Sequence, residues 1–370
     1  MKWLQNGNLA KLVAFFVISV VITCTVSFAA NGWESFVNDS GVTDNTAADV
    51  NQGSNTDQDN DNKTDNTVQA VLPVQKYYHA ITGLETDAQT YLKRPVCFVF
   101  SSTDPLYGIS SSYLTIEIPT EYGNTRLLCF TDDAKTLGKI GSLAPCRGYI
   151  SNLAAYFCGI LLSYGNDDSV KYEYTEPDAI LDFSETVGYC YTEYNSFVYT
   201  NADLVNAFMT NSKIDENSSE VISLPYVFSS DSERYVFDGE SANNVFITYS
   251  EGNSTQLVYS PEDKCYLLIK NNSTKSDLLN DKALKYDNAF VLYADSTTYE
   301  SADTTQLIMD TYSSGTGLYM CDGKYIEITW EKDSSGALVF YNDGKQLTAN
   351  RGTTYIGFVK SSMKSSVKIS

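Results

Sequence analysis

Short apolar segments separated by turn residues fill the second half of the chain and constrain its fold more than any other feature. They combine β-branched and aromatic residues, often with the period of two expected of strands. Asp322-Gly323, between two alternating arms, is the strongest hairpin signal, and Asp343-Gly344 is similar. The pattern predicts a mainly antiparallel β domain, a sandwich or a partly open barrel, over residues 221–362, with residues 363–370 as a tail. The predicted strands are Val245–Tyr249, Gln256–Tyr259, Cys265–Lys270, Ala289–Ala294, Gln306–Tyr312, Leu318–Cys321, Tyr325–Trp330, Leu338–Tyr341 and Thr354–Val359.

The first half mixes strand and helix patterns. Pro95–Ser101 is a nearly continuous apolar run, which predicts a central strand buried on both faces. Gly148–Tyr164 begins with a short helical pattern and ends as an apolar strand. Asn201 is a good N-cap for a helix that runs to about Lys213. Residues 71–220 are therefore predicted to form a mixed α/β sheet domain, which makes the whole chain α+β.

The stretch Tyr113–Phe130 predicts a hairpin at the centre of this first domain. Leu114, Ile116 and Ile118 alternate with polar residues, as in a half-buried strand. A symmetric loop would place Ile118 opposite Thr125 and Glu117 opposite Arg126, where an ion pair could form across the strands.

The N-terminus has the pattern of a targeting segment. Lys2 and Lys11 precede the uncharged run Leu12–Ala30, and Ala29 completes the small-residue spacing that signal peptidase requires. Residues 1–30 are therefore predicted to be a cleaved signal peptide. The run is also long enough for a retained membrane anchor, and lipidation at Cys24 is a third alternative. Each would place the body of the protein outside the cytoplasm, secreted or held on the outer face of the membrane.

Residues 31–70 form an acidic linker. Between Asn31 and Thr67 the chain has eight Asp or Glu residues and one lysine, Lys63. Such a segment buries too little apolar surface to offset the entropy of ordering it, so we expect it to be disordered. It would hold the folded part away from a membrane or wall.

The charge and the histidine count exclude several classes of function. A formal charge of −21 disfavours nucleic acid and anionic lipid, which require clustered Lys and Arg. Membrane contact is therefore expected only through the N-terminal segment. His79 is the single histidine, so neither a Ser-His-Asp triad nor a multi-histidine zinc site can form. No phosphate-binding loop or nucleophile elbow is present, and we predict no catalytic residue, metal or cofactor.

Seven cysteines follow Ala29, an odd number with irregular spacing and no CxxC pair. This pattern is not that of a disulfide framework, and it favours buried, reduced thiols. They are Cys97, Cys129, Cys146, Cys158, Cys190, Cys265 and Cys321.

Three motifs resemble those of the YerB-like lipoprotein family. TIEIPTEYGNTRLLCF is similar to the family pattern VYEAPVEGGITRLLALF, and SGTGLYMCDGKYIEITWEKD follows SGKGLYFxDGKVIEGTWKKD almost residue for residue. KIGSLAPCRGYISNLA resembles VGPVRSARPYFLDLA. The matching positions in the first and third motifs are Glu117, Pro119, Glu121, Gly123, Thr125, Arg126, Leu127, Leu128, Gly141, Arg147, Tyr149, Leu153 and Ala154.

The resemblance implies a bacterial, exported and usually lipid-anchored protein of unestablished biochemical function. This chain departs from the family at two places. Ala144 replaces the first arginine of RSAR, and Asn195–Tyr199 replaces a histidine-bearing HNLY segment.

Two hypotheses of function follow. The first is a non-catalytic binding or scaffold protein of the cell envelope, with peptidoglycan or an envelope protein as its partner. Its candidate surface comprises Glu117, Glu121, Arg126 and Arg147. The second is an envelope polysaccharide hydrolase that uses Glu117 and Glu121 as acid and base, since two carboxylates about 5–10 Å apart are the minimum for glycoside hydrolysis. Signalling through a protein partner is a third, weaker idea.

Overall fold

The computed structural model describes residues 75–165, 180–182, 188–193, 196–218, 222–230, 233–300, 305–333 and 338–370. These residues belong to one compact unit, Leu72–Ser370. The predicted export segment 1–30 and acidic linker 31–70 lie outside them. Within the described ranges, no helix is both long and apolar enough to cross a membrane.

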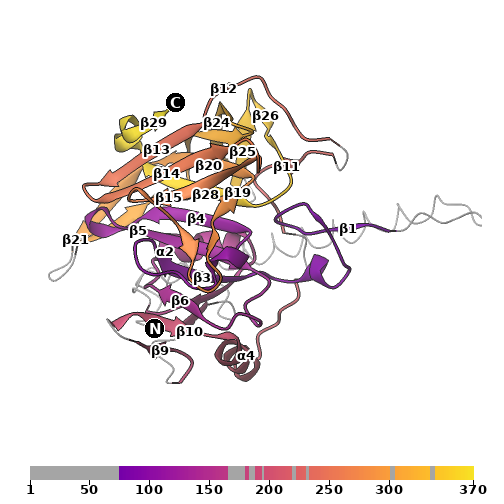
Figure 1. Cartoon of the computed structure of the whole chain (residues 1–370), viewed down its shortest axis with the longest axis vertical. Helices are drawn as coiled ribbons and strands as arrows, with labels where there is room; N and C mark the ends of the chain where they lie inside the picture. The colour runs from indigo at the N-terminus through magenta and orange to yellow at the C-terminus, as the bar shows by residue number, and fades with distance from the viewer. Residues whose placement is uncertain are drawn as a thin grey trace, which may run out of the picture. The chain divides into compact units, whose positions relative to one another are not determined.

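Strands dominate the described chain and form several sheets (Figure 1). The largest sheet follows the order β26-β25-β24-β23-β20-β28-β4-β5-β3-β6-β10-β9, with β7, β8 and β12 attached beside it. Its strands are β3 (Val96–Ser101), β4 (Leu114–Pro119), β5 (Thr125–Thr131), β6 (Ile140–Leu143), β7 (Ile160–Ser163), β8 (Ile180–Asp182), β9 (Tyr191–Thr192), β10 (Val198–Thr200), β12 (Glu240–Ser241), β20 (Asn288–Ala294), β23 (Ser314–Cys321), β24 (Lys324–Lys332), β25 (Leu338–Asn342), β26 (Lys345–Gln346) and β28 (Thr354–Lys360).

A second sheet packs against the first. It has the order β16-β15-β14-β13-β29, with β19 attached to β15. Val245, Leu257 and Leu268 of this sheet share a buried cluster with Phe98 and Val291 of the large sheet. Its strands are β13 (Asn244–Ser250), β14 (Asn253–Ser260), β15 (Cys265–Lys270), β16 (Ser273–Thr274), β19 (Lys285–Tyr286) and β29 (Val367–Ile369).

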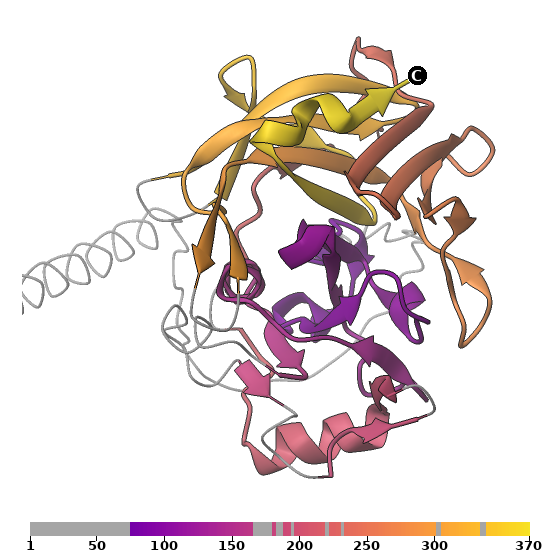
Figure 2. The same cartoon turned by 90° about the vertical axis from the view of Figure 1, so that its left-hand side faces the viewer.

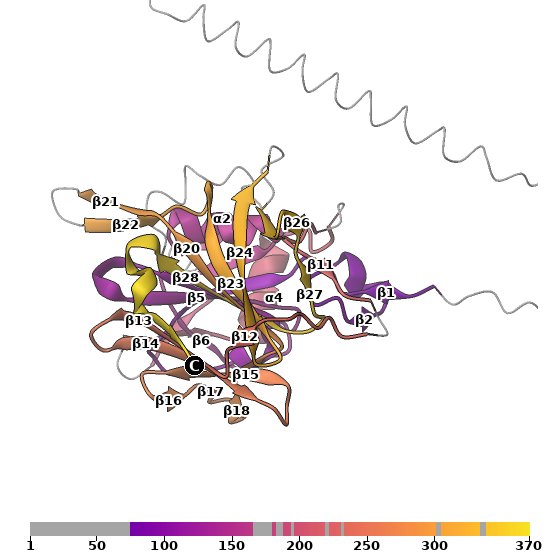
Figure 3. The same ribbon diagram turned by 90° about the horizontal axis from the view of Figure 1, so that it is seen from above.

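The smaller elements lie around these two sheets. The hairpin of β21 and β22 extends away from them (Figure 3). These elements are β1 (Tyr77–Tyr78), β2 (Glu85–Thr86), β11 (Val227–Phe228), β17 (Ser276–Asp277), β18 (Lys282–Ala283), β21 (Ser296–Glu300), β22 (Thr305–Met309), β27 (Thr348–Ala349) and the short 3₁₀ helices η2 (Thr90–Leu92), η3 (Ile109–Ser111), η4 (Glu121–Gly123) and η7 (Ser361–Ser366).

The two halves of the chain meet in the large sheet. Strand β28 of the second half pairs in parallel with β4 of the first, with Gly357 opposite Glu117. Residues 363–370, predicted as a tail, include β29, which pairs with β13. The described chain is thus β-rich across both halves. The finer α+β description and the boundary near residue 220 stay predictions.

Strand β3 lies in the interior, as its apolar run predicted. Val96, Phe98 and Phe100 face the second sheet, whereas Cys97 and Val99 face the helix α2 (Gly148–Tyr156). Since both faces of β3 are covered, alternation with polar residues is not required. In Figure 2 the first half of the chain, including β3 and α2, is drawn in indigo to magenta.

The helix predicted after Asn201 is α4 (Ala202–Asn211). The Asn201 side chain accepts a hydrogen bond from Leu204 N at 3.0 Å, which confirms the predicted cap. Val205, Phe208 and Met209 bury its inner face. The Asp322-Gly323 hairpin is also confirmed, because both residues have positive φ in the turn between β23 and β24.

The predicted register of the β4–β5 hairpin is wrong by one residue. Ile118 pairs with Arg126 and Glu117 pairs with Leu127. The loop is not symmetric, because Pro119 still pairs with Thr125 and η4 closes the turn. A one-residue shift exchanges the faces of a strand, so Glu117 and Arg126 lie on opposite faces of the sheet. The predicted Glu117–Arg126 ion pair is therefore absent.

Candidate functional site

Glu117 lies in the core rather than on a surface. All of β4 is buried, and the Glu117 side chain has an exposed fraction of 0%. The prediction of a half-buried strand was thus wrong, since the second sheet covers the face that carries Glu117. Because Glu117 is buried, it cannot belong to the predicted binding surface of Glu117, Glu121, Arg126 and Arg147.

The Glu117 carboxylate has partners from both halves of the chain. It accepts hydrogen bonds from Thr125 Oγ1 at 2.6 Å, Thr255 Oγ1 at 2.8 Å and the Tyr355 hydroxyl at 2.7 Å. The Lys270 ammonium forms an ion pair with it, with only 2% of the lysine side chain exposed. Burial alone raises the pKa of Glu117, but the charge and hydrogen bonds of Lys270 outweigh burial and leave this pKa below its ordinary value.

Glu121 and Arg147 form a second ion pair near the tip of the hairpin. Arg147 precedes α2 and donates from Nε and Nη2 to the two carboxylate oxygens of Glu121, each at 3.0 Å. Leu307 N of β22 also donates to Glu121, at 3.3 Å. Burial raises the pKa of Glu121, but the Arg147 hydrogen bond and charge hold it below its ordinary value. Of the four residues of the predicted candidate surface, the structure thus brings Glu121 and Arg147 into direct contact.

Arg126 lacks such a partner. It projects from the face of β5 opposite to Thr125, and its Nη1 makes one long hydrogen bond, 3.4 Å, to Thr125 O. Its Nε atom is buried and has no hydrogen-bond partner in the described part of the chain. Burial and then the charge of Arg147 lower the pKa of Arg126, while Glu121 opposes them. Arg126 is thus a half-buried cation without an ion pair among the described residues.

Tyr122 at the tip of η4 was not singled out by sequence reasoning. It is 83% exposed and has a φ of 58°, a left-handed conformation that is strained for a tyrosine. The backbone beside it is fixed, because Gly123 O accepts hydrogen bonds from Ser250 Oγ at 3.0 Å and Asn253 Nδ2 at 2.7 Å. The fold therefore presents an exposed aromatic ring on a fixed backbone, in the turn that joins Glu121 to the strand of Arg126. In the sequence, the only indication of this feature was Gly123, the next residue, which is typical of a turn.

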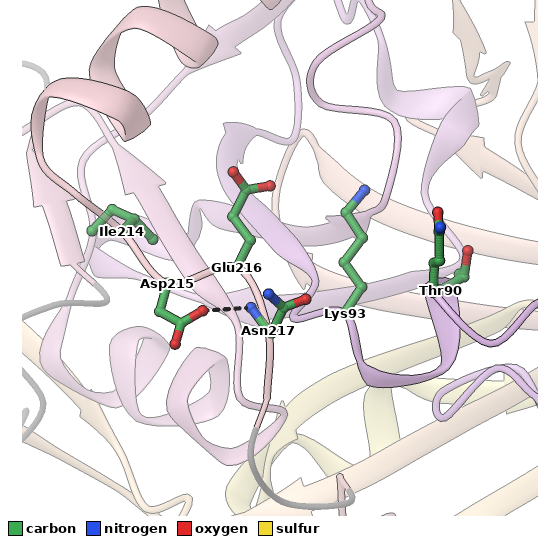
Figure 4. Close-up of a pocket in the computed structure, with 7 residues that line it drawn as sticks. Thr90, Lys93, Ile214, Asp215, Glu216 and Asn217 are labelled. Atoms are coloured by element: carbon green, nitrogen blue, oxygen red, sulfur yellow. Dashed lines mark hydrogen bonds between the residues drawn. The ribbon is translucent and has the colours of Figure 1, made fainter.

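A cavity of about 480 Å³ lies elsewhere, between η2 and the segment after α4 (Figure 4). Its charged side chains already have partners: Glu216 forms an ion pair with Lys135, and Lys93 Nζ donates to Asp132 O at 3.2 Å. Asp215 accepts a hydrogen bond from Asn217 N at 3.0 Å. This cavity is thus a weaker candidate than the region of Arg126.

His79 is bound within the fold through both ring nitrogens. Its Nδ1 accepts hydrogen bonds from Ile81 N and Thr82 N, at 3.3 and 3.1 Å, and its Nε2 lies 3.0 Å from Asp132 Oδ2. Two N–H donors at Nδ1 place the proton on Nε2, which donates to Asp132. Within the described ranges, no group of three or more His, Cys, Asp or Glu side chains could hold a metal ion.

The cysteines in the described part of the chain form no disulfide bonds. Cys158 and Cys190 are partly buried, and the others are buried: Cys97, Cys129, Cys146, Cys265 and Cys321. Burial raises the pKa of the Cys129 thiol to about 12, so this thiol is unreactive at neutral pH.

Of the two family departures, Ala144 is buried beside α2. The segment Asn195–Tyr199 lies only partly within the described residues.

Comparison with known proteins gives two family matches. "Protein of unknown function (DUF3048) N-terminal domain" matches residues 81–220, and "Protein of unknown function (DUF3048) C-terminal domain" matches residues 245–356. The crystal structure of the YerB protein from Bacillus subtilis has a similar fold, with a TM-score of 0.69 and 21% sequence identity. The similarity covers 80% of this chain and 100% of that chain. No curated protein matches the chain.

Proposed function

Since the chain belongs to the YerB-like family of two-part proteins of unknown function, we propose its role from the geometry of the site. It is a non-catalytic binding protein of the cell envelope that recognises an acidic group of peptidoglycan. The binding surface, here called the arginine surface, comprises Glu121, Tyr122, Arg126 and Arg147.

The observation that carries this proposal is that Arg126 forms no ion pair with any residue that the structure describes. A guanidinium has five N–H donors and binds carboxylates in a planar, bidentate manner. Arg126 uses one donor weakly, and its buried Nε donates to nothing in the described part of the chain. The guanidinium therefore keeps a positive charge that no acidic side chain of the described residues neutralises at ion-pair distance, and an acidic ligand would compensate it. Arg147 adds positive charge nearby, while Glu121 fixes its orientation.

Tyr122 supplies the second element of the proposed recognition. Exposed aromatic rings provide an apolar contact surface with a polar tip at low entropic cost, and this ring is held four residues from Arg126. Peptidoglycan combines sugar rings with the free carboxylates of its stem peptides. The predicted export segment and acidic linker would carry the arginine surface to this polymer.

The alternative of a polysaccharide hydrolase receives little support from the two glutamates. Glu117 is fully buried and ion-paired, whereas Glu121 is bound to Arg147 near the tip of the hairpin. A general acid requires a raised pKa, and the pKa values of both groups lie below the ordinary value. Neither carboxylate is thus prepared to donate a proton to a glycosidic oxygen.

The test is retention of the purified full-length protein on insoluble peptidoglycan. We expect Arg126→Ala to weaken retention about tenfold or more, because a hydrogen-bonded charge contact is lost. Arg234→Ala is the matched control, since Arg234 is paired with Asp322 in another part of the fold. Equal retention of the Arg126→Ala variant, with an unchanged unfolding curve, would refute the arginine surface. Retention on solubilised envelope protein instead of peptidoglycan would refute the choice of partner.

A further inference from the structure

A second cavity, of about 390 Å³, lies between the loop after β3 and the segment that follows β15. Thr103, Asp104 and Pro105 line one side, whereas Ser273, Thr274 and Lys275 line the other. Its volume is at the lower end of the range for small-molecule sites. Strands β15 to β18 lie at one edge of the molecule in Figure 3.

Asp277 fixes the two walls of this cavity to each other. Its carboxylate is completely buried and accepts hydrogen bonds from Gly108 N at 2.9 Å, Ser110 N at 2.9 Å and Ser110 Oγ at 2.7 Å. It also accepts one from Leu279 N at 2.8 Å, and Leu278 N donates to Leu106 O at 2.9 Å. The cavity is therefore preorganised, because its walls are held together by the fold itself.

Two lysines line the cavity, and Lys275 is the one that has no acidic partner among the described residues. It is half-buried, and its Nζ makes two long hydrogen bonds to main-chain carbonyls, 3.3 Å to Thr103 O and 3.5 Å to Asp104 O. Lys270 also lines the cavity, but its ammonium is bound by Glu117, Thr125 and Thr255. Burial and then the charge of Lys270 lower the pKa of Lys275, so its positive charge is incompletely compensated.

Asp104 provides the opposite charge. In the described part of the chain its carboxylate takes part in no hydrogen bond and no ion pair within 4.0 Å, including with Lys275. The charge of Asp104 raises the pKa of Lys275, as an anion in the same cavity should. The lining of the cavity thus includes one cation and one anion that form no direct ion pair with each other.

We propose that this cavity binds a small zwitterion of the amino-acid class, with the ligand carboxylate on Lys275 and the ligand ammonium on Asp104. Opposite charges that are held apart on rigid walls match a ligand in which an ammonium and a carboxylate group are attached to the same carbon atom. Hydroxyl groups of Thr103, Ser273 and Thr274 supply further hydrogen-bond partners. The arginine surface is formed by other residues, so failure of this site would leave that proposal intact, although the charge of Asp104 also raises the pKa of Arg126.

Calorimetric titration of the full-length protein tests the proposal with chosen probes. Glycine, L-alanine, D-alanine and L-serine carry both charges, whereas acetate carries the carboxylate alone and methylamine the ammonium alone. The dipeptide alanyl-alanine separates the two charges. We expect at least one free amino acid to bind about tenfold or more tightly than acetate or methylamine, because each charge contributes a charge-assisted hydrogen bond.

Two variants assign the charges. Lys275→Met should abolish binding of the amino acid, and Asp104→Asn should reduce its affinity to that of acetate. Lys282→Met is the matched control, since Lys282 is exposed on β18 and does not line the cavity. Because the Asp104 carboxylate forms no hydrogen bond or ion pair with the described residues, the Asp104→Asn variant should fold normally even if Lys275→Met does not. Equal binding of acetate and alanine, tighter binding of the dipeptide, or no binding of any probe would overturn the proposal.

Discussion

The carboxylate of Glu117 and the ammonium of Lys270 form a completely buried ion pair between residues 153 positions apart in the sequence. Thr125 and Thr255 each contact both charged groups. Strand β4 of the first half is thereby bonded to β15 of the second half within the core. The ion pair connects the two sheets through their buried faces. Because Glu117 is buried and paired in this way, it is unavailable to bind a ligand.

Removing Lys270 should destabilise the protein strongly. In a Lys270→Met variant Glu117 stays buried without a counter-charge, and we expect the free energy of unfolding to fall by about 3–5 kcal/mol. Chemical denaturation measures the change. A Glu117→Gln, Lys270→Met double variant should lose less than the single variant, because no uncompensated charge remains. A loss below about 1 kcal/mol for Lys270→Met would contradict a buried pair.

Stability should fall in acid because of Glu117 and Glu121. Both carboxylates have pKa values in the folded protein below the ordinary 4.5. Their contribution is therefore complete above the unfolded pKa and is lost as the pH falls through the folded pKa. The free energy of unfolding, measured between pH 7 and pH 3, should decrease below about pH 4.5. The Glu121→Gln variant should show a shallower decrease, and an identical slope would contradict its part in the effect.

Tyr122 should be costly for stability and useful for binding. Tyr122→Gly removes the left-handed strain and loses little packing, so we expect the free energy of unfolding to be unchanged or to rise by about 1 kcal/mol. Retention on peptidoglycan should nevertheless fall. Tyr122→Ala separates the two effects, since it removes the ring and keeps the strain. A stable Tyr122→Gly variant with full retention would remove Tyr122 from the arginine surface.

Gly123 should tolerate no side chain. Its φ is 73°, and an added Cβ would lie 2.3 Å from Ser250 Cβ. Gly123→Ala should therefore destabilise the protein by about 2 kcal/mol or more. Two control variants separate the effect of the positive φ from that of the close contact. Gly252 has a positive φ but no atom within 4 Å of an added Cβ, and Gly138 has neither the positive φ nor a close atom. Thermal unfolding should rank the losses Gly123, Gly252 and then Gly138, and any other order would contradict this account.

Several local features were predictable because their causes are local. The cap at Asn201, the turn at Asp322-Gly323 and the apolar run of β3 depend on residues within a few positions of one another. For Tyr122 the neighbouring Gly123 indicated a turn but not an exposed ring, since the loop is fixed by Ser250 and Asn253 from the other sheet. The hairpin was predicted but its register was not, because the register depends on the conformation of the loop.

The sequence by itself determined the β-rich character, the hairpin turns and the family motifs. The alternation of side chains along a strand and the residue types that favour a turn both depend on residues close together in the sequence. Tertiary structure decided the candidate site. It paired Glu117 with Lys270, placed Glu121 on Arg147 and left Arg126 without an ion-pair partner in the described chain. A one-residue register shift and a lysine from another sheet produced this outcome. Both depend on long-range packing, which no local pattern encodes.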